Sequence, residues 1–155
     1  YKFQPGKANF ELTAGLAGLW DYVDRVSEWT GASGPPRARL EAMFDAFAEI
    51  EASLAGKLLG FLRARGGVRI VGPEEPDPHR RVSTISFVVE GRQSEQLVLA
   101  ADREKLGIRF GDFYAYRLVQ TLGYEMDDGV VRASFVHYTS LDEIQRLIEA
   151  LDTLL

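Results

Sequence analysis

The sequence predicts an α+β fold, in which a small, mostly antiparallel sheet is covered by helices. Three observations lead to this prediction: the period of the apolar residues changes along the chain, short β-branched segments follow a long amphipathic one, and helices interrupt the later strands irregularly. A small sheet with helices packed largely on one face is the simplest way to bury such segments. The chain has 155 residues, 46% of them hydrophobic, which suffices for one sizeable core.

Two helices are predicted in the first part of the chain. Asn9 is a suitable cap for a helix over about 9–27, whose apolar residues recur at three- and four-residue spacing. The cluster 30–36 contains two glycines and two prolines, and it is the predicted domain boundary. A long amphipathic helix follows over 37–65 and stops at Gly66–Gly67.

The second part of the chain is predicted to alternate between strands and helices. Residues 68–71 are β-branched and residues 82–89 alternate between apolar and polar, so both segments are predicted strands. The proline-rich acidic segment 72–78 between them is a predicted exposed loop. The remaining expected elements are helices near 94–105 and 113–122 and strands at 107–110 and 130–136.

The last helix has the clearest local signal. Ser140 is followed three residues later by Glu143, which is the spacing of a capping box, and apolar residues then recur at helical spacing. The segment Asp127–Asp128–Gly129 before the last strand is interpreted as a turn, because no further carboxylates at suitable spacing accompany it.

Composition excludes several classes of function. The net charge of −5 opposes a broad phosphate-binding surface, so no nucleic-acid partner is expected. The chain has no cysteine, which excludes disulfides, thiolate metal sites and cysteine nucleophiles, and no constellation of metal ligands is present. No apolar run approaches the ~20 residues of a membrane helix, so no membrane partner and a cytoplasmic location are expected.

Three stretches resemble the class V aminotransferases and cysteine desulfurases, which are fold-type-I enzymes that use pyridoxal phosphate. Residues 3–11 are similar to a Gly-Thr-x-Asn segment and the helix that enters the small domain of that family. Residues 107–115 resemble its Arg-x-Gly-x-x-Cys-Ala stretch, and residues 131–140 resemble its Val-Arg-x-Ser-x-x-x-Tyr-Asn ending. The three stretches occur in the family's order, and together they span nearly all of the chain.

The resemblance implies that this is the C-terminal part of such an enzyme. Residues 1–34 would be the end of the large domain and a connecting helix, and residues 35–155 the C-terminal small domain. The family's Schiff-base lysine lies upstream of the first stretch, so no catalytic residue is expected within the chain, which alone would be inactive. The implied partners are an amino-acid substrate, the large domain that is missing here and, because the family generally pairs through that domain, a second subunit in a homodimer.

Two arginines are the candidate substrate-binding residues. By resemblance, Arg132 pairs with the α-carboxylate of the substrate, a task suited to a planar guanidinium that donates two parallel hydrogen bonds. Arg109, between two glycines, would line the same pocket from a loop. The alternatives are an arginine on the sheet surface or in an ion pair for Arg132, and a solvated loop arginine for Arg109. The candidate cofactor-binding residues are Gly6 and Lys7, which would reach the cofactor phosphate of a neighbouring subunit.

The sequence departs from the family at one informative position. The nucleophilic cysteine of the desulfurases falls at Tyr114, which favours amino transfer, elimination or racemisation over persulfide chemistry. Helix packing is the alternative role for Phe113, Tyr114 and Tyr116. His79 is expected in an exposed loop, and His137 is expected as a structural residue. A free-standing α+β module for ligand binding or dimerisation remains the alternative function.

Overall fold

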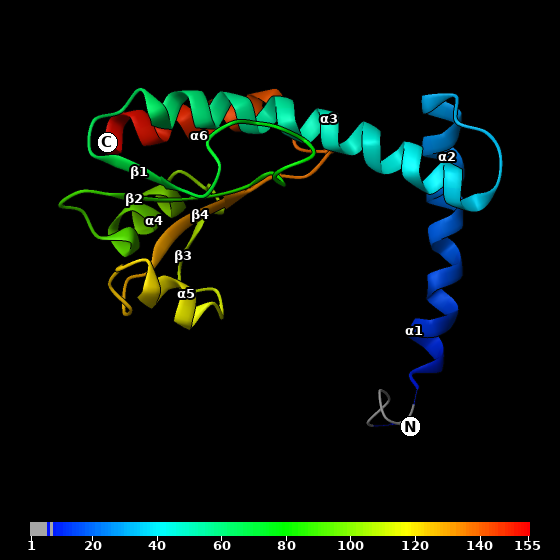
Figure 1. Cartoon of the computed structure of the whole chain (residues 1–155), viewed down its shortest axis with the longest axis horizontal. Helices are drawn as coiled ribbons and strands as arrows, with labels where there is room; N and C mark the ends of the chain where they lie inside the picture. The colour runs from blue at the N-terminus through cyan, green and yellow to red at the C-terminus, as the bar shows by residue number, and fades with distance from the viewer. Residues whose placement is uncertain (1–5, 7) are drawn as a thin grey trace. The chain divides into compact units, whose positions relative to one another are not determined.

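The computed structural model describes residue 6 and residues 8–155 (Figure 1). The described chain divides into two compact units, one up to Phe47 and one from Ala48 to Leu155. The helices are α1 (Phe10–Gly15), α2 (Leu19–Thr30), α3 (Pro36–Arg63), α4 (Ser94–Arg103), α5 (Tyr116–Thr121) and α6 (Leu141–Leu154), with a 3-10 turn η1 (Leu16–Gly18). The strands are β1 (Val68–Val71), β2 (Thr84–Val89), β3 (Arg109–Gly111) and β4 (Val130–Ser134).

The first unit is helical. The predicted cap is confirmed, since the backbone N–H of Leu12 donates to the Asn9 side chain at 2.8 Å. The predicted single helix is divided by η1 and continues to Thr30, where Gly31 takes a left-handed conformation with φ 71° that few other residues adopt without strain. A small core forms between α2 and the start of α3 from Val23, Val26, Met43 and Phe47.

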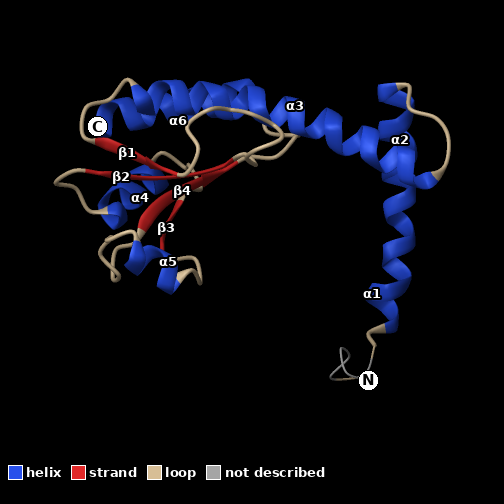
Figure 2. Ribbon diagram, viewed as in Figure 1, coloured by secondary structure: helices blue, strands red, loops and turns tan. Residues whose placement is uncertain are grey.

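The second unit contains the sheet. Its four strands lie in the order β1-β2-β4-β3 and every neighbouring pair is antiparallel, so the predicted fold class is confirmed. Figure 2 shows α3 and α6 running on the same side of the strands. Among the described residues, no helix is long and apolar enough to cross a lipid bilayer.

One face of the sheet carries the hydrophobic core. Phe87 of β2 and Leu58 of α3 are fully buried, and side chains of α4 and α6 join the same cluster. The second face therefore lies away from this core. The buried members of the cluster are Leu54, Ala55, Leu58, Leu59, Leu62, Ile85, Phe87, Leu97, Val98, Ala101, Ile108, Val131, Ala133, Phe135, Ile144, Leu147 and Leu151.

Two helices of this unit begin at different kinds of cap. The predicted capping box of α6 is confirmed, because the Glu143 N–H donates to the Ser140 hydroxyl at 3.2 Å and the Ser140 N–H donates to the Glu143 carboxylate at 2.7 Å. The start of α4 is instead capped from a distant segment. The backbone N–H groups of Ser94 and Glu95 donate to the Asp128 carboxylate at 2.6 and 2.9 Å. The predicted turn thus has a structural role that the sequence did not indicate.

The predicted division at residues 34 and 35 concerns the domains of a longer enzyme, and it stays a prediction. The boundary between the two compact units lies within α3, after Phe47. A continuous helix therefore spans the boundary, as the uninterrupted amphipathic pattern from residue 37 to residue 65 predicts.

Candidate functional site

The second face of the sheet carries a group of polar side chains, which we call the polar strip: Thr84, Ser86, Arg109, Arg132 and Ser134. The strand register brings them together. Arg132 of β4 lies opposite Ser86 of β2 on one side and opposite Arg109 of β3 on the other. Two residues further along β4, Ser134 lies opposite Thr84, and the two hydroxyl oxygens are 3.2 Å apart. Side chains two residues apart on a strand share a face, so all five lie on the face away from the core.

The juxtaposition of two arginines is the chemical feature of this strip. Directly opposed residues on antiparallel strands have Cβ atoms about 4.5–5.5 Å apart, and like charges at such positions destabilise a sheet. A bound anion between or beside the guanidinium groups offsets this repulsion. The geometry is therefore suited to a carboxylate or another small anion.

Arg132 is the arginine available to a ligand. It is partly buried, its Nε atom has no hydrogen-bond partner, and among the described residues no carboxylate pairs with it. Its guanidinium carbon lies 3.8 Å from the centroid of the Phe113 ring. A buried donor without an acceptor costs about 1–3 kcal/mol. An acceptor supplied by a ligand would remove this cost.

Arg109 is more exposed and already partnered. Its Nη1 atom lies 3.3 Å from the Asp102 carboxylate of α4 and 2.6 Å from the carbonyl oxygen of its own neighbour, Ile108. Its side chain is 61% exposed, so the ion pair with Asp102 contributes little. The structure places Arg109 at the start of β3, so the loop position expected for it is wrong.

The segment after β3 differs from the predicted helix over 113–122. Phe113 and Tyr114 have left-handed backbone conformations, with φ 52° and 63°, and α5 begins only at Tyr116. Asp112 stabilises this turn, since its side chain accepts from the Tyr114 N–H at 3.0 Å and its carbonyl accepts from the Ala115 N–H at 2.8 Å. The side-chain hydrogen bond of Asp112 competes with a helical start at this position.

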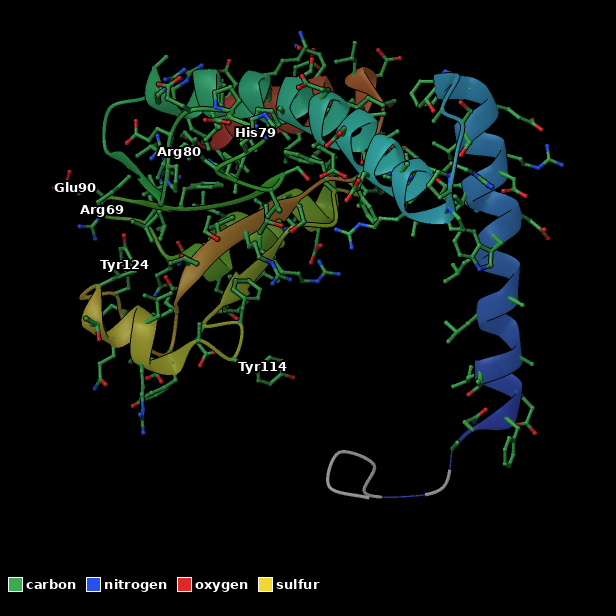
Figure 3. The ribbon with its side chains drawn as sticks, turned by 45° about the vertical axis from the view of Figure 1, so that its right-hand side comes forward. Arg69, His79, Arg80, Glu90, Tyr114 and Tyr124 are labelled. Carbon is green, nitrogen blue, oxygen red and sulfur yellow. The ribbon has the colours of Figure 1, made fainter. Side chains whose placement is uncertain are left out.

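The turn directs its two aromatic side chains differently. The Phe113 ring lies on the Arg132 guanidinium, whereas the Tyr114 side chain is fully exposed and extends away from the ribbon in Figure 3. By resemblance to the cysteine desulfurases, Tyr114 takes the place of their nucleophilic cysteine. In the described unit it contacts no member of the polar strip by a hydrogen bond, and its exposure means that helix packing is not its role either.

The predicted contact of Gly6 and Lys7 with a cofactor phosphate stays a prediction, because it would be made with a neighbouring subunit. Gly6 is exposed, and no atom lies within 4 Å of the position that a Cβ would occupy there. Lys7 lies outside the described residues. The polar strip has the positive charge and the hydroxyl groups that suit a carboxylate.

The remaining polar candidates have structural surroundings. His79 is exposed in the loop between β1 and β2 (Figure 3), where its backbone N–H donates to the Asp77 side chain at 2.8 Å. His137 lies beyond the end of β4 and its ring contacts Tyr138 edge to face, with centroids 5.1 Å apart. Neither imidazole belongs to the polar strip.

Sequence reasoning missed three features of the site. It weighed only helix packing and a catalytic role for Phe113, whose ring contacts a guanidinium, and it did not anticipate that Asp102 of α4 partners Arg109. The hydroxyl groups of Ser86 and Thr84 were also unassigned. The period-2 pattern of 82–89 could have placed these hydroxyls on the face opposite the apolar side chains of β2, but only the strand order brings them beside Arg132.

Comparison with known proteins identifies the family. The sequence profile described as "Aminotransferase class-V" matches residues 38–147, which is more than half of the chain. The chain belongs to the class-V aminotransferase family. The matched segment includes the whole polar strip, the Phe113 turn and the capping box of α6.

Individual relatives agree with this assignment. The chain is 34% identical over 155 residues to the aminotransferase-like protein FGM3 of Gibberella zeae, covering 99% of this chain and 35% of that protein. It is 32% identical over 154 residues to a probable cysteine desulfurase of Pseudomonas putida, covering 97% of this chain and 33% of that protein. The chain thus spans about a third of the length of these relatives.

Solved structures show the same fold. The structure of a cysteine desulfurase from Thermococcus onnurineus matches with a TM-score of 0.65 at 24% identity, covering 76% of this chain and 28% of that one. At this level of identity the match concerns the fold alone. Enzymes of the class-V aminotransferase family use pyridoxal phosphate as their cofactor, so the cofactor expected for the full-length enzyme is confirmed at the level of the family.

Proposed function

We propose that this chain supplies the substrate-carboxylate site of a pyridoxal-phosphate-dependent enzyme that acts on an amino acid. The observation that carries the proposal is Arg132, whose partly buried guanidinium has an Nε atom without an acceptor and no paired carboxylate among the described residues. Its position within the family profile supports the same interpretation.

The chemistry requires a residue of this kind. A guanidinium donates two parallel hydrogen bonds to a carboxylate, which fixes both the position and the orientation of the amino acid. Arg109, directly opposite on β3, adds positive charge beside the bound carboxylate, and Ser86 on the other side offers a hydroxyl group. The cofactor, when bound to the full-length enzyme, acts as an electron sink for bonds at the substrate Cα atom.

The proposed reaction is an aminotransferase or lyase reaction, or a racemisation, rather than desulfuration. The chain has no cysteine, and Tyr114 occupies the place of the family's sulfur-carrying nucleophile. A phenol does not form a persulfide, so the reaction class is amino transfer, elimination or racemisation, in which the cofactor alone activates the substrate.

The proposal extends to the organisation of the whole protein. By resemblance to the family, residues 35–155 form the C-terminal small domain of a cytoplasmic homodimer, and the Schiff-base lysine belongs to the large domain. The 155-residue chain alone is then inactive. The chain covers 35% and 33% of the two relatives described above, which supports its place within a longer enzyme.

The test is a titration of the natural full-length protein with amino acids in the presence of pyridoxal phosphate, followed by absorbance of the cofactor. Wild type is compared with Arg132→Ala and with Arg80→Ala, a control that removes an exposed arginine outside the polar strip (Figure 3). We expect a response to amino acids in wild type and Arg80→Ala that is at least tenfold weaker in Arg132→Ala, since one charged hydrogen-bonding partner contributes about 1.5–3 kcal/mol. Absence of cofactor absorbance in wild type would refute the proposal.

A further inference from the structure

The strongest unassigned feature beside the polar strip is the aromatic ring on Arg132. We propose that Phe113 is a positioning residue for Arg132: its ring fixes the plane of the guanidinium so that the free edge receives the substrate carboxylate. This inference rests on the proposed function and deepens it, because it names a second residue that determines how the carboxylate is bound.

The geometry of the contact between Phe113 and Arg132 favours a positioning role. The guanidinium carbon of Arg132 is 3.8 Å from the Phe113 centroid, whereas the other described cation–π pairs, Arg65 with Phe61 and Arg69 with Tyr124, are at 4.7 and 4.5 Å. At 3.8 Å the guanidinium carbon is at van der Waals distance from the face of the ring, where a planar guanidinium can stack. A carboxylate binds in the plane of a guanidinium along its edge, so the ring orients the group without competing with the ligand.

Phe113 packs outside the hydrophobic core. It is partly buried, but it is not a member of the hydrophobic core on the other face of the sheet. The neighbouring Tyr114 is fully exposed. An aromatic residue that served only as core packing would be expected among the buried cluster. The ring of Phe113 instead contacts the one arginine of the polar strip that lacks a carboxylate partner among the described residues.

The backbone conformation of the turn also supports a positioning role for Phe113. Phe113 and Tyr114 both have positive φ angles, which bulky residues rarely adopt and which persist only where the surroundings stabilise them. The hydrogen bonds of Asp112 close this turn immediately after Gly111, where β3 ends. A regular helix starting at residue 113 would give that residue a negative φ angle instead, so the left-handed turn is part of how the ring reaches Arg132.

The experiment uses three single variants and one double variant of the natural full-length protein with pyridoxal phosphate. Phe113→Asn removes the ring but keeps a residue that tolerates a left-handed backbone, and Phe113→Tyr keeps the ring. Arg132→Ala removes the anchor itself. The probe is whichever of the twenty standard L-amino acids gives the largest change in cofactor absorbance with wild type, and its decarboxylated amine is the matched ligand without a carboxylate.

We expect Phe113→Asn to weaken binding of the amino acid selectively. Phe113→Asn should weaken binding of the amino acid about five- to tenfold and change binding of the amine less than about twofold, while Phe113→Tyr should bind both like wild type. Added to Arg132→Ala, Phe113→Asn should have no further effect, because it acts through the guanidinium. The Nε–H signal of Arg132 in nuclear magnetic resonance should lose the ring-current shift in Phe113→Asn and keep it in Phe113→Tyr, a readout independent of activity.

The other outcomes separate the two proposals. If Arg132→Ala selectively weakens the amino acid but Phe113→Asn weakens both ligands equally or neither, the positioning role is wrong and the proposed function stands. If Arg132→Ala does not discriminate between amino acid and amine, or if no amino acid changes the cofactor absorbance of wild type, the proposed function itself is wrong and the positioning role falls with it.

Discussion

Gly129 lies in close contact with Gly111, and this contact sets how much stability the chain should lose when Gly129 is replaced. Gly129 has a φ angle of 65°, and a Cβ atom added there would lie 2.6 Å from the Cα of Gly111 and closer still to its carbonyl carbon and oxygen. These neighbours are backbone atoms at the end of β3, so they cannot rotate away as a flexible side chain would. Gly129→Ala should therefore separate β3 from the start of β4.

The expected loss of unfolding free energy in Gly129→Ala has two parts. A non-glycine residue in the left-handed region costs about 1–2 kcal/mol, and overpacking against a fixed neighbour adds about 1–3 kcal/mol. Gly129→Ala should therefore lower the free energy of unfolding by about 2–5 kcal/mol. The matched control is Gly123→Ala, where φ is 76° but nothing lies within 4 Å of the added Cβ, so only the first part applies.

The assay is urea unfolding of both variants and wild type, followed by circular dichroism. Fluorescence is unsuitable, because both tryptophans, Trp20 and Trp29, lie in the first compact unit and would not report on the sheet. Equal losses of stability in Gly129→Ala and Gly123→Ala would refute the steric reasoning. The larger loss in Gly129→Ala should be accompanied by weaker amino-acid binding of the full-length protein, because β3 carries Arg109 opposite Arg132.

Two further predictions concern helix caps. Hydrogen bonds from the backbone and, to a smaller extent, the side chain of Ser140 lower the pKa of Glu143. The Glu143 carboxylate therefore stabilises the fold at pH values above the ordinary pKa of a glutamate. This contribution is lost as the pH falls through the lowered pKa. Glu143→Gln should remove this part of the acid dependence of the unfolding midpoint; an unchanged pH profile would contradict it. Asp128→Ala should lower the free energy of unfolding in urea by about 1–2 kcal/mol, because α4 loses its cap. Asp127→Ala, at the exposed neighbouring residue, should lower it by less than about 0.5 kcal/mol. Equal effects of the two variants would contradict the assignment of the cap to Asp128.

Features that depend on nearby residues could be predicted from the sequence. The capping box of Ser140 and Glu143, the Asn9 cap and the strand 68–71 are predicted as observed, because each depends on residues within three or four positions or on a simple alternation. The helix predicted over 113–122 failed for a local reason as well. Asp112 binds the backbone of Tyr114, and propensity alone did not indicate that this turn would prevail over a helical start.

The candidate arginines could be named from sequence, but their relation to each other could not. Arg109 is expected in a loop and Arg132 on a strand, and their direct opposition follows from β3 pairing with β4. The role of Asp128 was similarly hidden, since it caps a helix that begins 34 residues earlier in the chain. Both features depend on pairing between segments far apart in the sequence.

The sequence by itself determined the α+β class, the order of the elements and the chemical types present: guanidinium groups without a cysteine. The tertiary structure decided which of these groups meet. Local periodicity encodes which face of a strand is apolar, but the strand order and register are set by how those apolar faces pack together under the helices. That packing places Arg132, Arg109 and Ser86 in one row on the opposite face and allows the Phe113 ring to lie against the guanidinium of Arg132.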